Sequence, residues 1–472
     1  MSLIIPANTL SSGGFAVDNS CRFNDGDTAY LHKTLGSGNR QIWTYSVWLK
    51  RSTLGTNQNW FPIQADAANN NNMAGYFDTA DKFNIFDYNS GVSAQLITNR
   101  VFRDTSAWMH ILVSADTTSG TANNRLRLYI NGTEERGVGG YATDTMPSQN
   151  YNFDINENGE ELYIGVNYIS SASTPFDGYM SEVTFIDGQQ LDATSFGEFD
   201  EDSGIWKPID VSGLTFGTNG FYLDFEDSAN LGNDANGGTD FTEVNLAATD
   251  QSTDTCTNNG AVLNNLYSGS GTGFSEGNLN YTQSASAWRS ALSTIAPNKG
   301  KWYMESKHIS GTYGWYGICD VTQAESFSNK WLGATETNGT GVALAKADGD
   351  VYINNSTAFN GSALSNGDIV GIALDLDNNY VYFSVNGTFL NSGNPASGSS
   401  GTGGFALPNK VALANYVFGV SSYAGSVLST NFGSPSYSES GGNSDGNGYG
   451  NFKTAPTSGY YSLNSKNLSE FG

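Results

Sequence analysis

Two short segments of the chain carry the same hairpin pattern. LYINGTEERG at residues 128–137 and YFSVNGTFLN at residues 382–391 each consist of an alternating run, an Asn-Gly pair and a second short run. Asn-Gly favours a type I′ turn, whose positive φ values match the twist of two paired strands. The pattern predicts a tight antiparallel hairpin in each half of the chain, at the middle of a sheet.

The rest of the sequence is rich in turn formers and strand formers. Gly occurs 57 times, Phe 26, Tyr 25 and Trp 9 times, while only 14% of the residues are charged. Stretches of helix-favouring residues are nearly absent, and the aromatic residues supply ample material for a core. A chain of 472 residues is long enough for two or three domains. The composition therefore predicts an all-β protein.

Strand-like runs fall into two regions on either side of a polar, turn-rich stretch. Their spacing is typical of antiparallel β-sandwiches. We predict a first sandwich over residues 1–245, a linker over 246–270 and a second sandwich over 271–433. Residues 434–472 form a Gly/Ser/Asn-rich, mobile segment followed by a C-terminal tail whose aromatic residues dock on another surface.

The charge balance narrows the range of partners. There are 21 basic and 46 acidic residues, a net charge of −25. Such a surface repels phosphates and anionic lipid, so the prediction is no nucleic acid, and neutral glycans or divalent cations instead. We expect no signal peptide and no membrane span, because the N-terminal residues lack a basic region and no apolar run approaches the length of a span. Cys21, Cys256 and Cys319 are too few for a disulfide framework and are expected to be free, buried thiols.

Four motifs in order make the first region resemble a laminin-G or pentraxin-type, concanavalin A-like domain. They are SCRFNDGDTAYL (20–31), WTYSVWLK (43–50), WMHILVSAD followed by LRLYINGTEERG, and LYIGVN followed by FDGYMSEVTFID. The second region resembles a SPRY domain in KGKWYMESKH (299–308), YGICDV (316–321) and GDIVGIALDLDNNYVYFSVNG (367–387). These resemblances imply two jelly-roll, concanavalin A-like β-sandwiches in tandem.

The pairing of the two modules resembles tail-fibre or virion-surface proteins of marine and cyanobacterial bacteriophages. The resemblance implies a non-enzymatic virion protein that recognises host polysaccharide or lipopolysaccharide through loops at the sandwich ends. It also implies other virion proteins as partners, a homo-oligomer (a trimer if a fibre), assembly in the host cytoplasm and release by lysis. Two alternatives stay open: a capsid decoration or head-fibre protein that docks other virion subunits, and a glycan depolymerase.

Calcium is a candidate ligand of the first region. Asp25 and Asp27 flank Gly26, and Asn167 and Asp177 follow later strands. The resemblance to laminin-G and pentraxin domains implies Ca²⁺ held by such side chains, and hard oxygen donors suit this ion. The alternative is that the segment NDGD is only a turn.

Aromatic and amide side chains are the candidate sugar contacts, because rings stack on pyranose faces and amides bond hydroxyl groups in both directions. Each of these aromatic residues can instead be a core residue. The predicted contacts are Trp60, Asn71, Tyr313, Trp315 and Trp331.

Catalysis is not expected. The carboxylate pairs Asp224/Glu226 and Asp375/Asp377 have the spacing of same-face strand neighbours, yet neither lies in an ExDxxE string of the kind found in glycosidases of this fold class. With only His32, His110 and His308 available, no Ser-His-Asp set is credible.

Overall fold

The computed structural model describes Ile4 and residues 14–66, 71–266, 270–321, 330–334, 341–408, 414–438 and 442–472. The chain divides into two compact units: the first unit is Leu10–Thr257, and the second unit is Asn258–Gly472 with Met1–Thr9. Both units are built almost entirely from antiparallel strands, which confirms the predicted all-β class. None of the helices in the described ranges is long and apolar enough to cross a membrane.

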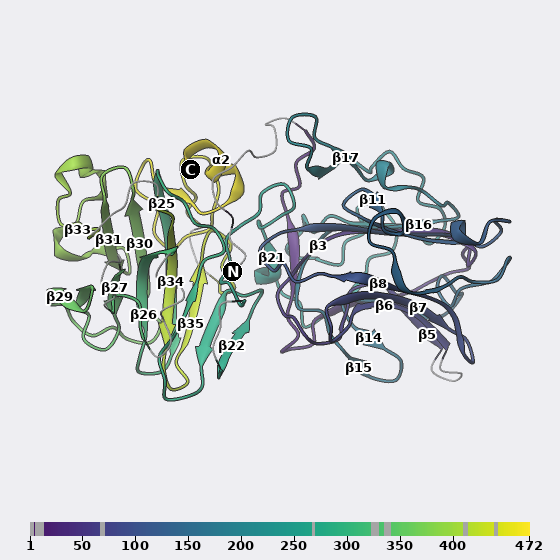
Figure 1. Ribbon diagram of the computed structural model, residues 1–472, viewed down its shortest axis with the longest axis horizontal. Helices are drawn as coiled ribbons and strands as arrows, with labels where there is room; N and C mark the ends of the chain where they lie inside the picture. The colour runs from purple at the N-terminus through teal and green to yellow at the C-terminus, as the bar shows by residue number, and fades with distance from the viewer. Residues whose placement is uncertain are drawn as a thin grey trace. The chain divides into compact units, whose positions relative to one another are not determined.

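The first unit is a sandwich of two sheets that lie face to face (Figure 1). One sheet has eight strands in the order β11-β10-β9-β3-β16-β1-β21, with β19 beside β16. Its strands are β1 (Ser20–Phe23), β3 (Ile42–Arg51), β9 (Met109–Asp116), β10 (Leu126–Ile130), β11 (Thr133–Glu134), β16 (Gly178–Asp187), β19 (Phe221–Leu223) and β21 (Gln251–Ser252).

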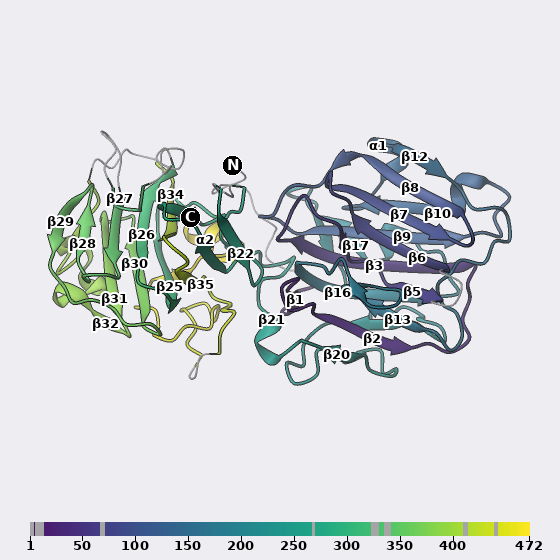
Figure 2. The ribbon, with the colours of Figure 1, turned by 90° about the horizontal axis from the view of Figure 1, so that it is seen from below.

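The other sheet of the first unit has nine strands in the order β12-β8-β7-β6-β5-β13-β2-β20, with β4 beside β6; Figure 2 shows them side by side. They are β2 (Tyr30–Thr34), β4 (Gln58–Asn59), β5 (Ile63–Asp66), β6 (Asn71–Phe77), β7 (Lys82–Tyr88), β8 (Val92–Val101), β12 (Tyr141–Thr145), β13 (Glu161–Ile164) and β20 (Thr242–Val244). The short elements are β14 (Asn167–Tyr168), β15 (Ala172–Ser173), β17 (Gly197–Phe199), β18 (Trp206–Pro208) and α1 (Glu135–Val138).

The central strand β3 explains how the eight-stranded sheet is buried on both faces. Successive side chains of a strand point to opposite faces. Trp43, Tyr45 and Val47 belong to the main core between the sheets. Trp48 belongs to a second cluster with Trp206 and other residues of the segment that follows β16. That segment therefore covers the outer face of the sheet.

The second unit is also a two-sheet sandwich. A nine-stranded sheet has the order β22-β23-β35-β25-β30-β31-β32, with β33 beside β31 and β36 beside β25; a six-stranded sheet has the order β24-β34-β26-β27-β28-β29 (Figure 2). The elements are β22 (Thr272–Ser275), β23 (Asn280–Gln283), β24 (Arg289–Leu292), β25 (Lys301–Ser310), β26 (Trp315–Asp320), β27 (Gly341–Ala345), β28 (Val351–Ile353), β29 (Ser356–Phe359), β30 (Ile369–Asp375), β31 (Tyr380–Val385), β32 (Thr388–Phe389), β33 (Phe405–Ala406), β34 (Tyr416–Ser422), β35 (Val427–Asn431), β36 (Tyr461–Ser462) and α2 (Ser465–Phe471).

Both predicted Asn-Gly hairpins form, but at sheet edges. The φ values are 47° and 77° at Asn131 and Gly132, and 48° and 84° at Asn386 and Gly387, as a type I′ turn requires. The strands after these turns, β11 and β32, end their sheets, so the prediction that the hairpins lie at the middle of a sheet is wrong. Each strand pairs for only two residues before the chain leaves the sheet.

The stretch 246–270 is not a linker in its described part. Gln251–Ser252 pairs with β1 in the first unit, and Gly260 and Leu263 form bridges to Asn464 and Ser293 in the second. Its polar composition misled the prediction, because backbone pairing and a few buried apolar side chains, among them Val262 and Leu263, hold it in place. The boundary between the units therefore falls after Thr257.

The C-terminal segment 434–472, predicted to start as a mobile stretch, folds onto the second unit over its described residues 442–472. Phe452 is fully buried and meets the Tyr303 ring at a centroid distance of 5.1 Å. Asp445 accepts hydrogen bonds from the backbone of Ser462 and the side chain of Asn467, both at 2.8 Å. Aromatic burial and one buried carboxylate thus order a sequence of low complexity.

Candidate functional site

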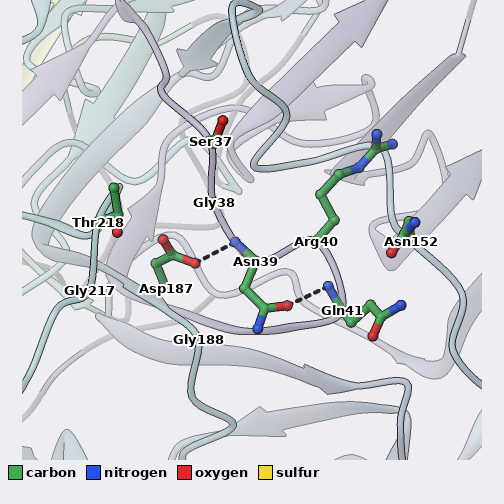
Figure 3. A pocket seen from close by; sticks show the side chains of 10 residues that line it. All are labelled: Ser37, Gly38, Asn39, Arg40, Gln41, Asn152, Asp187, Gly188, Gly217 and Thr218. Carbon is green, nitrogen blue, oxygen red and sulfur yellow. Dashed lines mark hydrogen bonds between the residues drawn. The ribbon is translucent and has the colours of Figure 1, made fainter.

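A groove of about 540 Å³ opens at one end of the first sandwich (Figure 3). Its walls are the loop that enters β3, the chain leaving β16 and the loop that precedes β19. Trp43 near the start of β3 pairs with Asp187 at the end of β16, so these loops meet at the same end of the sheet. The lining residues are Ser37, Gly38, Asn39, Arg40, Gln41, Asn152, Asp187, Gly188, Gly217 and Thr218.

Asp187 fixes the groove wall. One carboxylate oxygen accepts the Asn39 backbone N–H at 2.8 Å and the Asn156 amide at 2.7 Å, and the other accepts the Asn219 backbone N–H at 3.2 Å. Asp187 is only 7% exposed. Charge-assisted bonds of this kind are stronger than neutral ones, so the three loops are held together by one side chain.

Arg40 lines the groove but is engaged within the protein. Its Nε donates to the Phe153 carbonyl at 2.7 Å, and its other nitrogens meet Asp154 at 2.9 Å and Glu157 at 2.8 Å. A guanidinium with this many partners is a fixed structural element. The groove is thus not organised around a free cation.

The groups that face the opening are neutral. Ser37, Asn152 and Thr218 are exposed, and their side chains make no hydrogen bond to the rest of the described chain. Asn39 uses its carbonyl oxygen to accept the backbone N–H groups of Gln41 and Ile42, both at 2.9 Å, which leaves its amide nitrogen for a ligand. Hydroxyl and amide groups both donate and accept, as a sugar requires.

A buried carboxyl group holds the loop that carries the groove residue Asn152. Asp87 accepts a hydrogen bond from the Tyr151 hydroxyl at 2.5 Å and from the Asp154 backbone at 2.8 Å. Burial outweighs these bonds and raises the pKa of Asp87 to about 7, with the nearby Asp154 adding to the rise. This support of the groove therefore changes its charge near neutral pH.

A second candidate site lies at one end of the six-stranded sheet in the second unit. Antiparallel register brings the start of β24, the end of β34 and the start of β26 together: Arg289 pairs with Ser422, and Trp315 with Ser421. The flanking rings form an aromatic cluster, defined here as Trp288, Tyr313, Trp315, Trp331, Tyr352 and Tyr423.

The rings of the aromatic cluster meet at close range. Trp288 lies at 5.1 Å from Tyr423, 5.7 Å from Trp331 and 5.9 Å from Tyr313, between ring centroids. Trp315 stacks on Trp331 at 5.3 Å. Three residues predicted as sugar contacts, Tyr313, Trp315 and Trp331, are thus neighbours in space.

The other two predicted sugar contacts lie elsewhere. Trp60 is fully buried in the main core, 4.8 Å from the Phe83 ring, so it has no surface for a ligand. Its neighbourhood in the sequence is polar, which misled the prediction. Asn71 begins β6 and accepts the Ser90 backbone N–H at 3.3 Å across the strands. Neither residue lines the groove.

Asp25 and Asp27, two of the predicted calcium ligands, share one turn, whereas Asp177 precedes β16 and Asn167 begins β14. Phe23 pairs with Gly178, so the turn carrying Asp25 and Asp27 runs beside Asp177. The Thr28 backbone N–H donates to the Asp25 carbonyl at 3.3 Å, so NDGD does form a turn. Burial raises the pKa of Asp25 and, with Asp250 adding to the rise, the pKa of Asp27.

The predicted calcium ligands fit a hard cation only in part. The Asn167 side-chain oxygen has no hydrogen-bond partner in the described chain, whereas Asp177 is 1% exposed and accepts the Thr53 hydroxyl. Across the described residues, no group of three or more His, Cys, Asp or Glu side chains is placed to hold a metal. A bound ion would thus depend on amide and carbonyl oxygens as well.

The carboxylate pairs are structural. Asp375 accepts the backbone and side-chain N–H groups of Asn378 at 2.9 and 2.8 Å and pairs with Lys301 at 3.2 Å. Asp377 accepts the Gly300 backbone at 2.8 Å. Asp224 lies outside β19 and accepts the backbone N–H of Glu226 at 3.1 Å, so this pair forms a turn rather than a strand face.

One Ser–His contact is arranged against catalysis. His110 Nε2 lies 2.8 Å from the Ser46 hydroxyl, while the Trp206 indole N–H donates to His110 Nδ1 at 3.1 Å. Because an indole nitrogen can only donate, Nδ1 is the acceptor and Nε2 carries the proton, so His110 cannot accept a proton from Ser46. Burial also lowers the pKa of His110 to about 3. All three cysteines are free, as predicted; Cys21 and Cys319 are buried, whereas Cys256 is only half-buried. Burial raises the pKa of each thiol.

Sequence reasoning missed the groove residues. Their signal was the clustering of turn residues in GSGNR (36–40) and FGTNG (216–220), next to strand ends. Which of these loops meet depends on strand register, which a single sequence does not give.

Comparisons with known proteins agree with this architecture. Residues 24–193 match the family described as the concanavalin A-like lectin/glucanases superfamily. Comparison with functionally curated proteins finds no match. The first unit is thus a concanavalin A-like sandwich, a fold compatible with glycan recognition.

Three solved structures show the range of likeness. A heptameric SAP-like pentraxin from Limulus polyphemus is 13% identical and covers 44% of this chain and 93% of its own, with a TM-score of 0.31. Mouse laminin α1 domains LG4-5 are 10% identical and cover 90% of this chain and 91% of their own, with a TM-score of 0.30. The SPRY domain of human HERC1 is 12% identical and covers 32% of this chain and 87% of its own, with a TM-score of 0.25. Likeness at this level carries no conclusion about partners or activity.

Proposed function

We propose that this protein binds neutral glycans without cleaving them, through the groove at the end of the first sandwich. The observation that carries the proposal is a preformed concave site, within a lectin-like fold, whose free side chains are hydroxyl and amide groups. Asp187 and Arg40 hold the loops in place from within. A site fixed before binding loses little conformational entropy when a ligand arrives.

The net charge of −25 favours a neutral ligand over an anionic one. Neutral sugars present hydroxyl groups that pair with side chains such as Asn152 and Thr218. Each such bond contributes about 1 kcal/mol to affinity, so several are needed for specificity. The absence of a free cation among the described lining residues agrees with this ligand class.

The experiment is a glycan array followed by calorimetry on the sugars that bind. The variant Asn152→Ala removes a contact to the sugar, and the variant Ser37→Trp fills the groove. Asn57→Ala, at an exposed residue that follows the other end of β3, is the matched control. We expect weaker binding in the two groove variants and none of this loss in the control. Unchanged binding in a folded Ser37→Trp variant would exclude the groove.

The more specific part of the proposal is a virion-surface role: a phage tail-fibre or receptor-binding protein that recognises host polysaccharide or lipopolysaccharide. What supports it is the resemblance of the two sequence regions, in that order, to such proteins. Mass spectrometry of purified virus particles tests it. Detection of the protein in intact particles is the expected result, and its absence from particles that infect normally would refute the role.

A calcium site that uses Asp25, Asp27, Asn167 and Asp177 is likewise proposed. The Asn167 side-chain oxygen, which has no hydrogen-bond partner in the described chain, supports it, because a cation would satisfy this oxygen.

A further inference from the structure

The aromatic cluster of the second unit has a buried floor and a rim made of the exposed Tyr313 and the half-buried Trp288 and Tyr423. Trp315 is 9% exposed and stacks on Trp331 with an interplanar angle of 23°. Tyr313 is 40% exposed and meets Tyr423 at 5.3 Å. Stacked and edge-on contacts hold aromatic rings in defined orientations. The rim rings are therefore fixed before any ligand arrives.

The loop that carries Tyr313 is fastened from below. His308 Nε2 lies 3.1 Å from the Gly311 carbonyl and therefore donates to it, so Nδ1 is the acceptor of the Tyr316 hydroxyl at 2.6 Å. Tyr313 itself donates its backbone N–H to the Ser426 hydroxyl at 3.1 Å. These bonds position the ring without using its hydroxyl group.

Two features argue against a cluster that serves only to cover the sheet. Tyr313 leaves much of a large aromatic side chain in water, which gives up the burial that makes aromatic residues useful in a core. The buried Trp331 indole N–H has no acceptor in the described chain, a cost that well-packed cores avoid. Exposed large rings and unpaired buried donors are more frequent at functional sites than in ordinary cores.

The chemistry of the rim indicates the partner. Exposed ring faces suit the C–H face of a pyranose, and polar groups at the edge suit its hydroxyls. The Tyr352 hydroxyl donates to the Asp348 carboxylate at 3.0 Å, so an acceptor with spare lone pairs borders the rings. The acidic chain disfavours an anionic ligand.

We infer that the aromatic cluster is a second carbohydrate-binding site, which takes a neutral pyranose stacked on the rim formed by Tyr313, Trp288 and Tyr423. The ligand class rests on the proposed function, but the residues are separate from the groove. The two sites recognise a sugar differently: the groove by hydrogen bonds to hydroxyls, the cluster by contact with the ring face.

The test is saturation-transfer NMR on the full chain with methyl β-D-glucopyranoside and methyl β-D-galactopyranoside. Variants are Tyr313→Ala and Trp288→Ala, with Phe199→Ala as the control, since Phe199 is an aromatic residue of the first unit that is 52% exposed. We expect transfer to ring C–H protons in the wild type, and binding about tenfold weaker in Tyr313→Ala. The control keeps the wild-type affinity.

Three outcomes would overturn the inference: no transfer to either glycoside in the wild type, unchanged transfer in a folded Tyr313→Ala variant, or binding of tetramethylammonium at the cluster in place of the glycosides. If Trp288→Ala does not fold, Tyr313→Ala, whose ring is exposed, still decides. Ser37→Trp separates the two proposals. If only Ser37→Trp loses all transfer, the glycosides bind at the groove and the inference about the cluster is refuted. If only the cluster variants lose transfer, the glycosides bind at the cluster and not at the groove.

Discussion

The groove of the first unit and the aromatic cluster of the second lie at sandwich ends and are built from different materials. Asp187 holds the groove through three hydrogen bonds to loop residues. The cluster is held by rings that stack where three strands start or end. Hydrogen bonds to a carboxylate require a particular charge state, whereas ring packing does not. The pKa of Asp87, which supports the groove, is raised to about 7, and the pKa of His308, beneath the cluster, is lowered to about 4, so the two supports should respond to pH in opposite directions.

Removing the charge of Asp87 should have the largest effect on stability. The folded pKa of Asp87 is raised to about 7, above the unfolded value of about 3.9. The unfolded chain therefore loses its proton first, and stability falls as pH rises from about 4 through 7, by at most about 4 kcal/mol. Asp87→Asn mimics the protonated carboxyl group and should remove this fall. Chemical denaturation at pH 5 and pH 8 measures it; a slope equal to that of the wild type would contradict the role of Asp87.

Asp187→Ala should destabilise the first unit by about 3 kcal/mol, because two backbone N–H groups and one amide lose a buried acceptor. Glycan binding at the groove should fall with it, since the loops are no longer fixed. Asp202→Ala, at an exposed carboxylate without a hydrogen bond in the described chain, is the control. Thermal unfolding compares the variants, and equal midpoints would show that Asp187 does not organise the loops.

The support of the cluster should lose stability in acid, whereas the support of the groove loses it as pH rises. Burial lowers the folded pKa of His308 to about 4, below the unfolded value of about 6.5. The unfolded chain takes up its proton first, so this contribution is present above pH 6.5 and is lost as pH falls toward 4, by about 1–2 kcal/mol. His308→Gln should flatten the loss in that window. Binding of methyl glycosides measured at pH 7 and pH 4.5 reports whether the Tyr313 loop loosens in parallel.

Calcium binding should have the smallest effect on stability. At an ion concentration a few times its dissociation constant, binding to the folded state adds about 1 kcal/mol. The expected result is a rise in the unfolding temperature of the wild type in millimolar CaCl₂, abolished by chelator and by the double substitution Asp25→Asn, Asp27→Asn. The substitution Asp78→Asn, at another turn carboxylate of the same unit, should leave the rise intact. No rise in the wild type would refute the calcium proposal.

Local patterns in the sequence predicted what depends on a few neighbouring residues. The Asn-Gly turns took the expected positive φ values at Asn131 and Asn386 because the turn itself dictates them. Tyr313 and Trp315 were predicted as neighbouring sugar contacts, and in the structure both rings contact Trp288. Nothing local distinguished Trp60 from these residues, since its polar sequence neighbours do not show that its ring enters the core.

The sequence by itself determined the strand-forming and turn-forming segments, the all-β class and the acidic surface, because these follow from side-chain size, backbone freedom and charge. Only the tertiary structure decided which strand ends are neighbours. Register placed Asp187 beside Trp43 and Trp315 beside Ser421, and so assembled one site from hydrogen-bonding loops and the other from rings. Pairing between distant strands is fixed by the packing of both sheets at once, and a single strand carries no record of its partner.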